Sequence, residues 1–186
     1  FEMGYIDSFE EIMAMETGFL QYAMKLLKED YAKELEILKV ELPDASRIPA
    51  VRFDVAKELV AKKYNRQIRN PFDLEPEEEA LIGQYFKEEY NADFVFVTHY
   101  PSKKRPFYAM DDPSDEKFTL SFDLLFRGLE ITTGGQRIHA RGGTRAAARR
   151  AVPARRTVLC AADRAAARRG RADTRHDDDL PAHAVV

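Results

Sequence analysis

The chain has 186 residues, 45% of them hydrophobic, and a formal net charge of −3, which fits a soluble globular protein with one hydrophobic core. The single cysteine, Cys160, excludes a disulfide framework and favours a reducing, cytoplasmic setting. No apolar run approaches the roughly 18 residues of a membrane span, and the first residues lack the pattern of a secretory signal, so we expect no membrane association. Because the chain starts at Phe1 rather than at a methionine, we expect it to be a fragment of a longer protein.

The first expected element is a short strand over residues 2–6, followed by a long helix. Ser8 and Glu11 form the Ser-x-x-Glu pattern of a capping box, which marks the start of a helix. Apolar residues then recur every three or four positions. This periodicity predicts one amphipathic helix that continues to about residue 37.

Two further helices are expected before the chain changes to strand-like patterns. The segment VELPDASRIP is interrupted by two prolines and is predicted to be a loop. A short strand over 51–53 and a short helix over 54–64 follow. Another helix is expected from Pro76 to about Tyr90, because proline is favoured at the first helical position and acidic residues fill the first turn.

The following segments are rich in β-branched and aromatic residues and are separated by turn residues, which is typical of strands. They are DFVFVTHY (93–100), PFYAM (106–110), FTLSFDLLFR (118–127) and LEITT (129–133). Short connections between consecutive strands favour antiparallel pairing. Helices first and strands later predict an α+β fold rather than a doubly wound one.

The segment GLEITTGGQR is the first candidate site. Gly134 and Gly135 would let a ligand approach the backbone closely. In a regular strand Glu130 and Thr133 lie on opposite faces, and the glycine turn could bring them together. A carboxylate and a hydroxyl suit Mg²⁺ shared with phosphate oxygens, and Arg137 can bind a carboxylate with two hydrogen bonds. The alternative is a β-turn with a surface ion pair, and the spacing alone favours that alternative. The pattern of a P-loop is missing.

Two other segments offer weaker candidates. In YPSKKRPFY, Arg105 and Tyr108 could both point into a cleft, whereas Lys103 and Lys104 fit an ordinary solvated turn. Glu2 is a lone acid at the start of a strand, which is usually a surface residue. The four histidines lack metal-ligand spacing, and with one cysteine a zinc site is not expected.

The composition changes abruptly at about residue 140. Residues 1–140 contain all 12 Phe and 8 Tyr and carry a net charge of −9, whereas residues 141–186 contain 11 Arg and 5 Asp and carry +6. A segment with so few large apolar residues cannot offset its ordering entropy by burial. We therefore expect a disordered Arg/Ala-rich tail over residues 140–186.

Three segments in this order, FEMGYIDSFEEIM, YPSKKRPFYAM and FDLLFRGLEITTGGQRIH, resemble the catalytic domain of class II aspartyl-tRNA synthetases, nearest to the archaeal type. The resemblance covers residues 1–139 and implies an antiparallel sheet flanked by helices. It also implies a two-step reaction. ATP and aspartate form aspartyl-adenylate, and the aspartyl group then moves to the terminal ribose of tRNA.

The resemblance implies roles for nine residues, which fall into three groups. Those expected to hold Mg²⁺ and the ATP phosphates are Glu130 and Thr133. Those expected to bind or lie near the substrate aspartate are Arg137, which would bind its side-chain carboxylate, and Arg105, Tyr108 and Glu2. Those expected to support the site are Asp123, Gly134 and Gly135.

The same resemblance implies ATP and Mg²⁺ as cofactors, tRNA-Asp as the second substrate and a homodimeric parent enzyme, and it leaves tRNA-Asn open. The chain contains neither motif 1 nor motif 3 of the family and only part of motif 2. We therefore expect the isolated chain to be inactive and marginally stable. The alternatives are an asparaginyl-tRNA synthetase or synthetase-like asparagine-forming paralogue, and a truncated paralogue without catalytic activity.

The basic tail departs from the family pattern directly after His139. Residue types encoded by AT-rich codons, such as Lys, Asn, Ile and Phe, are absent from it, as in a GC-rich gene translated out of frame. We therefore interpret residues from about 140 onward as a frameshift product. The alternative is a basic arm that binds RNA phosphates. Resequencing decides between them, because an intact reading frame for the tail would exclude a frameshift.

Overall fold

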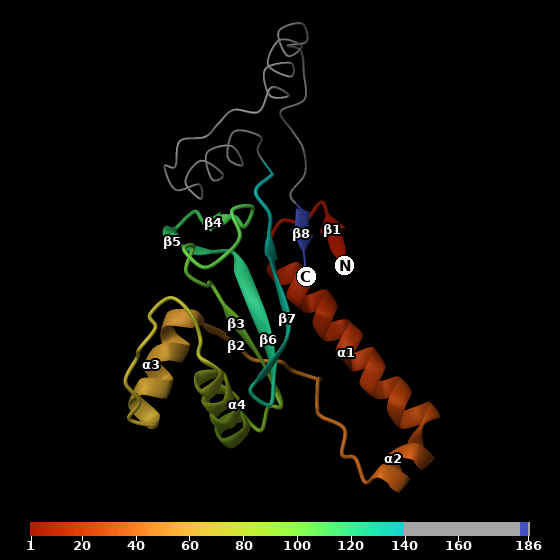
Figure 1. Cartoon of the computed structure of the whole chain (residues 1–186). Coiled ribbons are helices and arrows are strands. Elements are labelled where there is room, and N and C mark those ends of the chain that lie inside the picture. Colours follow the sequence, from red (N-terminus) through yellow and green to blue (C-terminus); the bar gives the residue numbers. More distant parts are fainter. Residues whose placement is uncertain (140–182, 186) are drawn as a thin grey trace, which may run out of the picture.

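The computed structural model describes residues 1–139 and the backbone of residues 183–185 (Figure 1). The elements are β1 (Glu2–Gly4), α1 (Glu10–Asp30), α2 (Ala32–Leu38), β2 (Ala50–Arg52), α3 (Phe53–Lys63), α4 (Pro76–Tyr90), β3 (Phe94–Thr98), β4 (Asp111–Asp112), β5 (Asp115–Thr119), β6 (Ser121–Phe126), β7 (Leu129–Gln136) and β8 (His183–Val185). The α+β class is confirmed. The disorder expected for 140–186 concerns residues outside the described ones, apart from β8, which pairs with β1 and β7.

The main sheet has the strand order β1-β8-β7-β6-β3-β2, and β4 pairs with β5 in a separate ribbon. Its pairs are antiparallel except for β2 and β3, which are parallel. The parallel pair arises because α3 and α4 form a crossover that returns the chain in the same direction. The sheet is therefore mixed, where the sequence predicted an antiparallel one.

Helix α1 covers one face of the sheet (Figure 1). It begins at Glu10, within the predicted capping box, and the Glu11 carboxylate accepts the backbone N–H of Asp7 at 2.7 Å. The predicted single helix is divided at Tyr31 into α1 and α2. The core on this face includes Phe9, directly before α1, and side chains from α1, β3 and β6, among them Ile12, Phe94, Phe96, Phe122 and Leu124.

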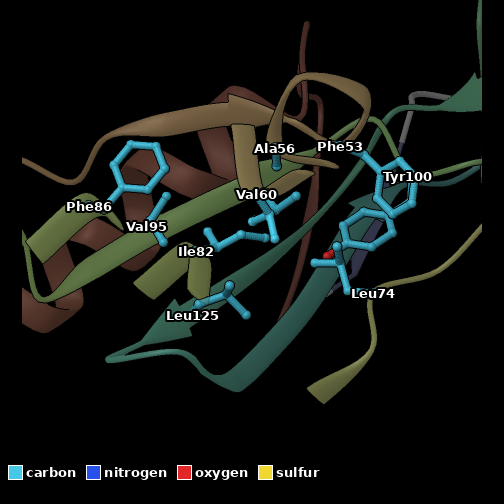
Figure 2. Packing of buried hydrophobic residues seen from close by; sticks show 10 residues of the cluster. Phe53, Ala56, Val60, Leu74, Ile82, Phe86, Val95, Tyr100 and Leu125 are labelled. Atoms are coloured by element: carbon cyan, nitrogen blue, oxygen red, sulfur yellow. The ribbon is translucent and has the colours of Figure 1, made fainter. Parts of the chain in front are cut away.

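The opposite face is covered by α3 and α4, and Figure 2 shows the core between them and the sheet. It includes Phe53, Ala56, Val60, Leu74, Ile82, Phe86, Val95, Tyr100 and Leu125. Successive strand residues point to opposite faces, so Leu124 packs toward α1 and Leu125 toward α3 and α4. Asp123, two positions before Leu125, shares the α3/α4 face. No described helix is long and apolar enough to cross a membrane.

Candidate functional site

A hollow of about 270 Å³ lies where the end of β7 meets the segment that follows β3. Six of the nine predicted residues line it: Arg105, Tyr108, Thr133, Gly134, Gly135 and Arg137. Thr133 and Gly135 of β7 and Arg137, which directly follows β7, are alternate residues and share a face. Gly135 leaves that face without a side chain. A Cβ at Gly135 would lie 2.9 Å from the Leu120 carbonyl oxygen, so the close approach of the backbone requires glycine there.

The strand predicted over 106–110 does not form, and the observed segment shapes the hollow instead. The Ala109 N–H donates to the Pro106 carbonyl in a turn, and only Ala109 makes a β-bridge, with Arg137. Two backbone hydrogen bonds hold the segment against the end of β7, from Met110 to Gln136 at 2.8 Å and from Ile138 to Tyr108 at 2.9 Å. Proline at 106 removes one donor, which disfavours a continuous ladder.

Asp123, Arg105 and Thr133 form one hydrogen-bonded group below the hollow. Asp123 of β6 lies opposite Thr133 of β7, and its Oδ1 accepts from Arg105 Nη2 at 2.6 Å and from Thr133 Oγ1 at 2.5 Å. Arg105 Nη1 donates to Thr133 Oγ1 at 2.8 Å. Asp123 is only 5% exposed. A buried carboxylate is tolerated when a cation and hydroxyl donors compensate its charge, and this group meets that requirement.

Arg137 lies at the outer side of the hollow. Its Nη1 is 3.1 Å from Glu2 Oε1, in an exposed ion pair, and its guanidinium lies 5.0 Å from the centre of the Tyr108 ring. An exposed ion pair contributes little to stability, roughly 0–1 kcal/mol. A carboxylate ligand can therefore compete with Glu2 for this arginine at small energetic cost.

A β-bulge brings Glu130 to the same face as Thr133. Thr132 pairs with Leu124 and Glu130 pairs with Leu125, so Ile131 has no partner in the ladder. The extra residue reverses the alternation, and Glu130 shares the α3/α4 face instead of the opposite one predicted for a regular strand. Glu130 does not line the hollow.

The surroundings of Glu130 are acidic. Partial desolvation, and then the negative charge of Asp123, raise the pKa of Glu130, although Arg105 opposes the shift. Glu79 of α4 accepts a hydrogen bond from the Glu130 backbone, and burial followed by the Glu130 charge raises the pKa of Glu79. Neighbouring acids whose ionised forms are disfavoured provide a favourable place for a cation.

The oxygen donors on this face suit Mg²⁺ that is shared with phosphates and water. They do not suit a metal ion that is coordinated by protein side chains alone. Within residues 1–139 there is no group of three or more His, Cys, Asp or Glu suited to a metal ion. Glu130 and Thr133 therefore offer two oxygens, and Mg²⁺ usually takes one or two protein oxygens and completes its shell with phosphates and water. The Thr133 hydroxyl accepts from Arg105, which leaves it a second lone pair.

The model of the family described as tRNA synthetases class II (D, K and N) matches residues 1–152. This chain belongs to that family. The match extends slightly beyond the range 1–139 expected from the three sequence segments. The class II synthetase fold thus accounts for nearly all residues that the structure describes.

Curated synthetases are similar to most of this class II chain. The aspartate–tRNA(Asp/Asn) ligase of Aeropyrum pernix is 44% identical over 140 residues, or 74% of this chain and 32% of that protein. The aspartate–tRNA(Asp) ligase of Pyrococcus abyssi is 35% identical over 139 residues, again 74% and 32%. The chain spans about a third of the length of these relatives.

Solved class II synthetases share the fold. The aspartyl tRNA synthetase from Entamoeba histolytica superimposes with a TM-score of 0.78 at 22% identity, covering 98% of this chain and 36% of that one. The asparaginyl-tRNA synthetase from Pyrococcus horikoshii complexed with asparaginyl-adenylate gives a TM-score of 0.73 at 21% identity, covering 98% and 40%.

Sequence reasoning missed one residue beside the hollow. Tyr100 is 3% exposed, and the Arg105 guanidinium lies 4.0 Å from the centre of its ring. A buried tyrosine at the end of an apolar strand resembles any core aromatic residue. The sequence does offer one signal. Tyr100 follows the strand and stands five residues before Arg105, so the turn between them can bring the two side chains together.

Proposed function

We propose that this chain is part of an aspartate–tRNA ligase, which joins aspartate to ATP as aspartyl-adenylate and then transfers the aspartyl group to tRNA. The observation that carries the proposal is Arg137, placed at a hollow with Thr133 and Gly135 on one strand face and paired only weakly with Glu2. The similarity to aspartate–tRNA ligases supports it, with 44% identity to the Aeropyrum pernix ligase over 74% of this chain.

Arg137 binds the side-chain carboxylate of aspartate with two parallel hydrogen bonds and releases Glu2. Asparagine would present an amide N–H to a guanidinium that only donates, so it would bind more weakly. Tyr108 supports the guanidinium with its ring, 5.0 Å away, and Arg105 adds a positive charge on the same side. Glu2 remains beside the substrate, where its carboxylate can accept from the substrate ammonium group.

Glu130 and Thr133 would hold Mg²⁺, which neutralises charge on the ATP phosphates when bound. In adenylation the aspartate α-carboxylate attacks the α-phosphate and pyrophosphate leaves. Two anions must approach each other, so the contribution of these residues is positioning and charge neutralisation rather than proton transfer. Asp123 supports the site through its hydrogen bonds to Arg105 and Thr133, and Gly135 does so through the close backbone approach. Gly134 lines the hollow beside it.

The proposal extends to the partners of the whole enzyme. We infer tRNA-Asp as the acceptor, a homodimeric parent enzyme and a cytoplasmic location. The name of the Aeropyrum pernix relative includes tRNA-Asn as well. Charging assays of the full-length gene product with each tRNA distinguish an enzyme specific for tRNA-Asp from one that charges both.

The test is a titration of the ¹⁵N-labelled 186-residue chain with aspartate and, separately, asparagine, followed by NMR. We expect aspartate to shift the Arg137 side-chain signal and asparagine to have a much weaker effect. Substituting Arg137→Ala should abolish the response, whereas Lys25→Ala, far from the hollow, serves as a matched control that should not. Preferential binding of asparagine would favour the asparaginyl alternative, and no response to either would contradict the proposal for this chain.

Catalysis by the chain is tested separately. The 140 matched residues correspond to about a third of the length of the Aeropyrum pernix relative, so we expect no aspartate-dependent exchange of pyrophosphate into ATP. Clear aspartate-dependent exchange would show that these residues suffice for adenylation. Motif 1 and motif 3 sequences in the flanking gene, in any frame, would favour an interrupted enzyme gene over a non-catalytic paralogue.

A further inference from the structure

Tyr100 is a buried residue that contacts Arg105 of the Arg105–Asp123 pair. Its ring is 3% exposed, and Figure 2 shows it beside Phe53 of α3, with the two ring centres 5.0 Å apart. Its backbone is fixed as well, because its carbonyl oxygen accepts from the Thr119 N–H at 2.9 Å and from Thr119 Oγ1 at 3.0 Å. The ring is therefore held in place from several directions.

Two independent contacts connect this fixed ring to the site. The Arg105 guanidinium lies over the ring face, 4.0 Å from its centre, within the range of a cation–π contact. The Tyr100 hydroxyl hydrogen-bonds to the Asp123 side chain. Burial, and then the Asp123 charge, raise the pKa of Tyr100 well above its ordinary value, so the hydroxyl stays protonated and donates.

Arg105 depends on these contacts for its orientation. Its Nη1 and Nη2 donate to Thr133 and Asp123, whereas its buried Nε has no hydrogen-bond partner among the described residues. Two hydrogen bonds on one edge leave a guanidinium free to tilt about that edge. The Tyr100 ring face, 4.0 Å away, fixes the plane of the Arg105 guanidinium. The Tyr100 hydroxyl fixes the Asp123 carboxylate, which binds one edge of that guanidinium.

We propose that Tyr100 is a positioning residue that sets the orientation of Arg105 toward the hollow, with its ring fixing the guanidinium plane and its hydroxyl fixing Asp123. The inference rests on the proposed function for its consequence in aspartate binding. Tyr100 itself does not line the hollow. It acts through Arg105, which does line the hollow.

The test compares three variants of the 186-residue chain. Tyr100→Phe keeps the ring and removes the hydroxyl, and Tyr100→Leu removes both. Phe53→Leu is the matched control, because it loosens the same core and touches the Tyr100 ring without contacting Arg105. Each variant is measured for its folded fraction, for the NMR shift of the Arg105 side-chain N–H and for aspartate affinity.

The ring current of Tyr100 should displace the Arg105 N–H signal upfield in the unsubstituted chain. We expect Tyr100→Phe to keep this displacement and to weaken aspartate binding several-fold, and Tyr100→Leu to lose the displacement and weaken binding roughly tenfold. Phe53→Leu should lower stability and leave both site measurements near their original values.

Equal loss of affinity in Phe53→Leu and Tyr100→Leu, at the same folded fraction, would reduce Tyr100 to a core residue and overturn the inference. If Tyr100→Leu does not fold, an unchanged affinity and Asp123 carboxylate signal in Tyr100→Phe would overturn the role of the hydroxyl. If the unsubstituted chain does not bind aspartate, the proposed function fails for this chain, while the Arg105 signal still tests the orientation.

Discussion

Two carboxylates on opposite faces of the sheet are equally buried, but they differ in the groups that compensate their negative charge. Glu16 of α1 and Asp123 of β6 are each 5% exposed. Asp123 has an arginine and the hydroxyls of Thr133 and Tyr100 as partners. Glu16 Oε1 accepts from Thr132 Oγ1 at 2.5 Å, and its Oε2 has no partner among the described residues. Burial raises the pKa of Glu16, with the Thr132 hydrogen bond opposing the shift.

Adjacent residues of one strand serve these two carboxylates. Thr132 points toward α1 and Thr133 toward the hollow, so the same residue type completes a structural contact on one face and a site contact on the other. Burying a carboxylate costs less when a cation compensates its charge, whereas a buried carboxylate without a cation weakens the fold at neutral pH. Of these two carboxylates, the one on the side that faces the proposed substrates is compensated by a cation.

The largest effect is expected from Asp123→Ala. It leaves the Arg105 guanidinium largely buried without its anion, and removing one member of such a pair costs about 3 kcal/mol. Urea unfolding followed by circular dichroism measures the loss. Asp123→Asn, which keeps an acceptor of the same shape, should lose less. A loss below about 1 kcal/mol for alanine would mean that the compensated pair contributes no more than a surface ion pair.

Thr132→Val should cost about 1.5 kcal/mol, because Glu16 then loses the hydroxyl that its Oε1 accepts from. The change preserves side-chain shape, so the loss reports on the hydrogen bond. Repeating it in a Glu16→Leu background provides the control. In that background the valine should be almost neutral, and an unchanged cost would place the effect elsewhere in the core.

Glu16→Gln should stabilise the chain at pH 7 by about 1 kcal/mol, because the amide is neutral where the carboxylate is not. The folded pKa of Glu16 is raised above 4.5, so its protonated form favours folding below pH 4.5 and that contribution is lost as the pH rises through the folded value. The gain of the variant over the unsubstituted chain should therefore shrink at pH 4. Urea titrations of both chains at the two pH values measure the difference, and a gain independent of pH would contradict this account.

Thr133→Val should have the smallest effect on stability, about 0.5 kcal/mol, because Asp123 retains Arg105 after the hydroxyl is lost. The same urea assay allows direct comparison with Thr132→Val. If the change at 133 costs more than the change at 132, the two faces do not differ in the way proposed. The variant should nevertheless reduce any Mg²⁺-dependent binding of ATP.

The sequence predicted the helices and most strands. It also predicted that Arg105, Tyr108, Thr133 and Arg137 belong to one site, but this prediction came from family resemblance rather than from spacing. Spacing alone placed Glu130 and Thr133 on opposite faces, because a bulge at Ile131 depends on register with β6 and has no local signature. The prediction of a strand over 106–110 was wrong because Pro106 and the turn that follows it interrupt the strand hydrogen bonding.

The burial of Glu16 was also beyond sequence reasoning. A glutamate in an amphipathic helix normally faces solvent, and this one is buried because α1 packs against β7, far away in sequence. The division of the long helix at Tyr31 had no proline or glycine to mark it. The parallel pairing of β2 required knowledge of where the chain returns after α4.

The Arg127–Gly128 hairpin has a consequence for the order in which the molecule assembles. Both turn residues adopt positive φ, which suits a tight two-residue connection, and Asp123 and Thr133 are only ten positions apart along the chain. Thr132 and Glu16 are separated by 116 positions. Closing the longer loop costs about 2 kcal/mol more in chain entropy. The Asp123–Thr133 contact is therefore local in sequence and can form fast, whereas the Glu16–Thr132 contact cannot. The hairpin that carries Asp123 and Thr133 can form early, before α1 docks on its other face.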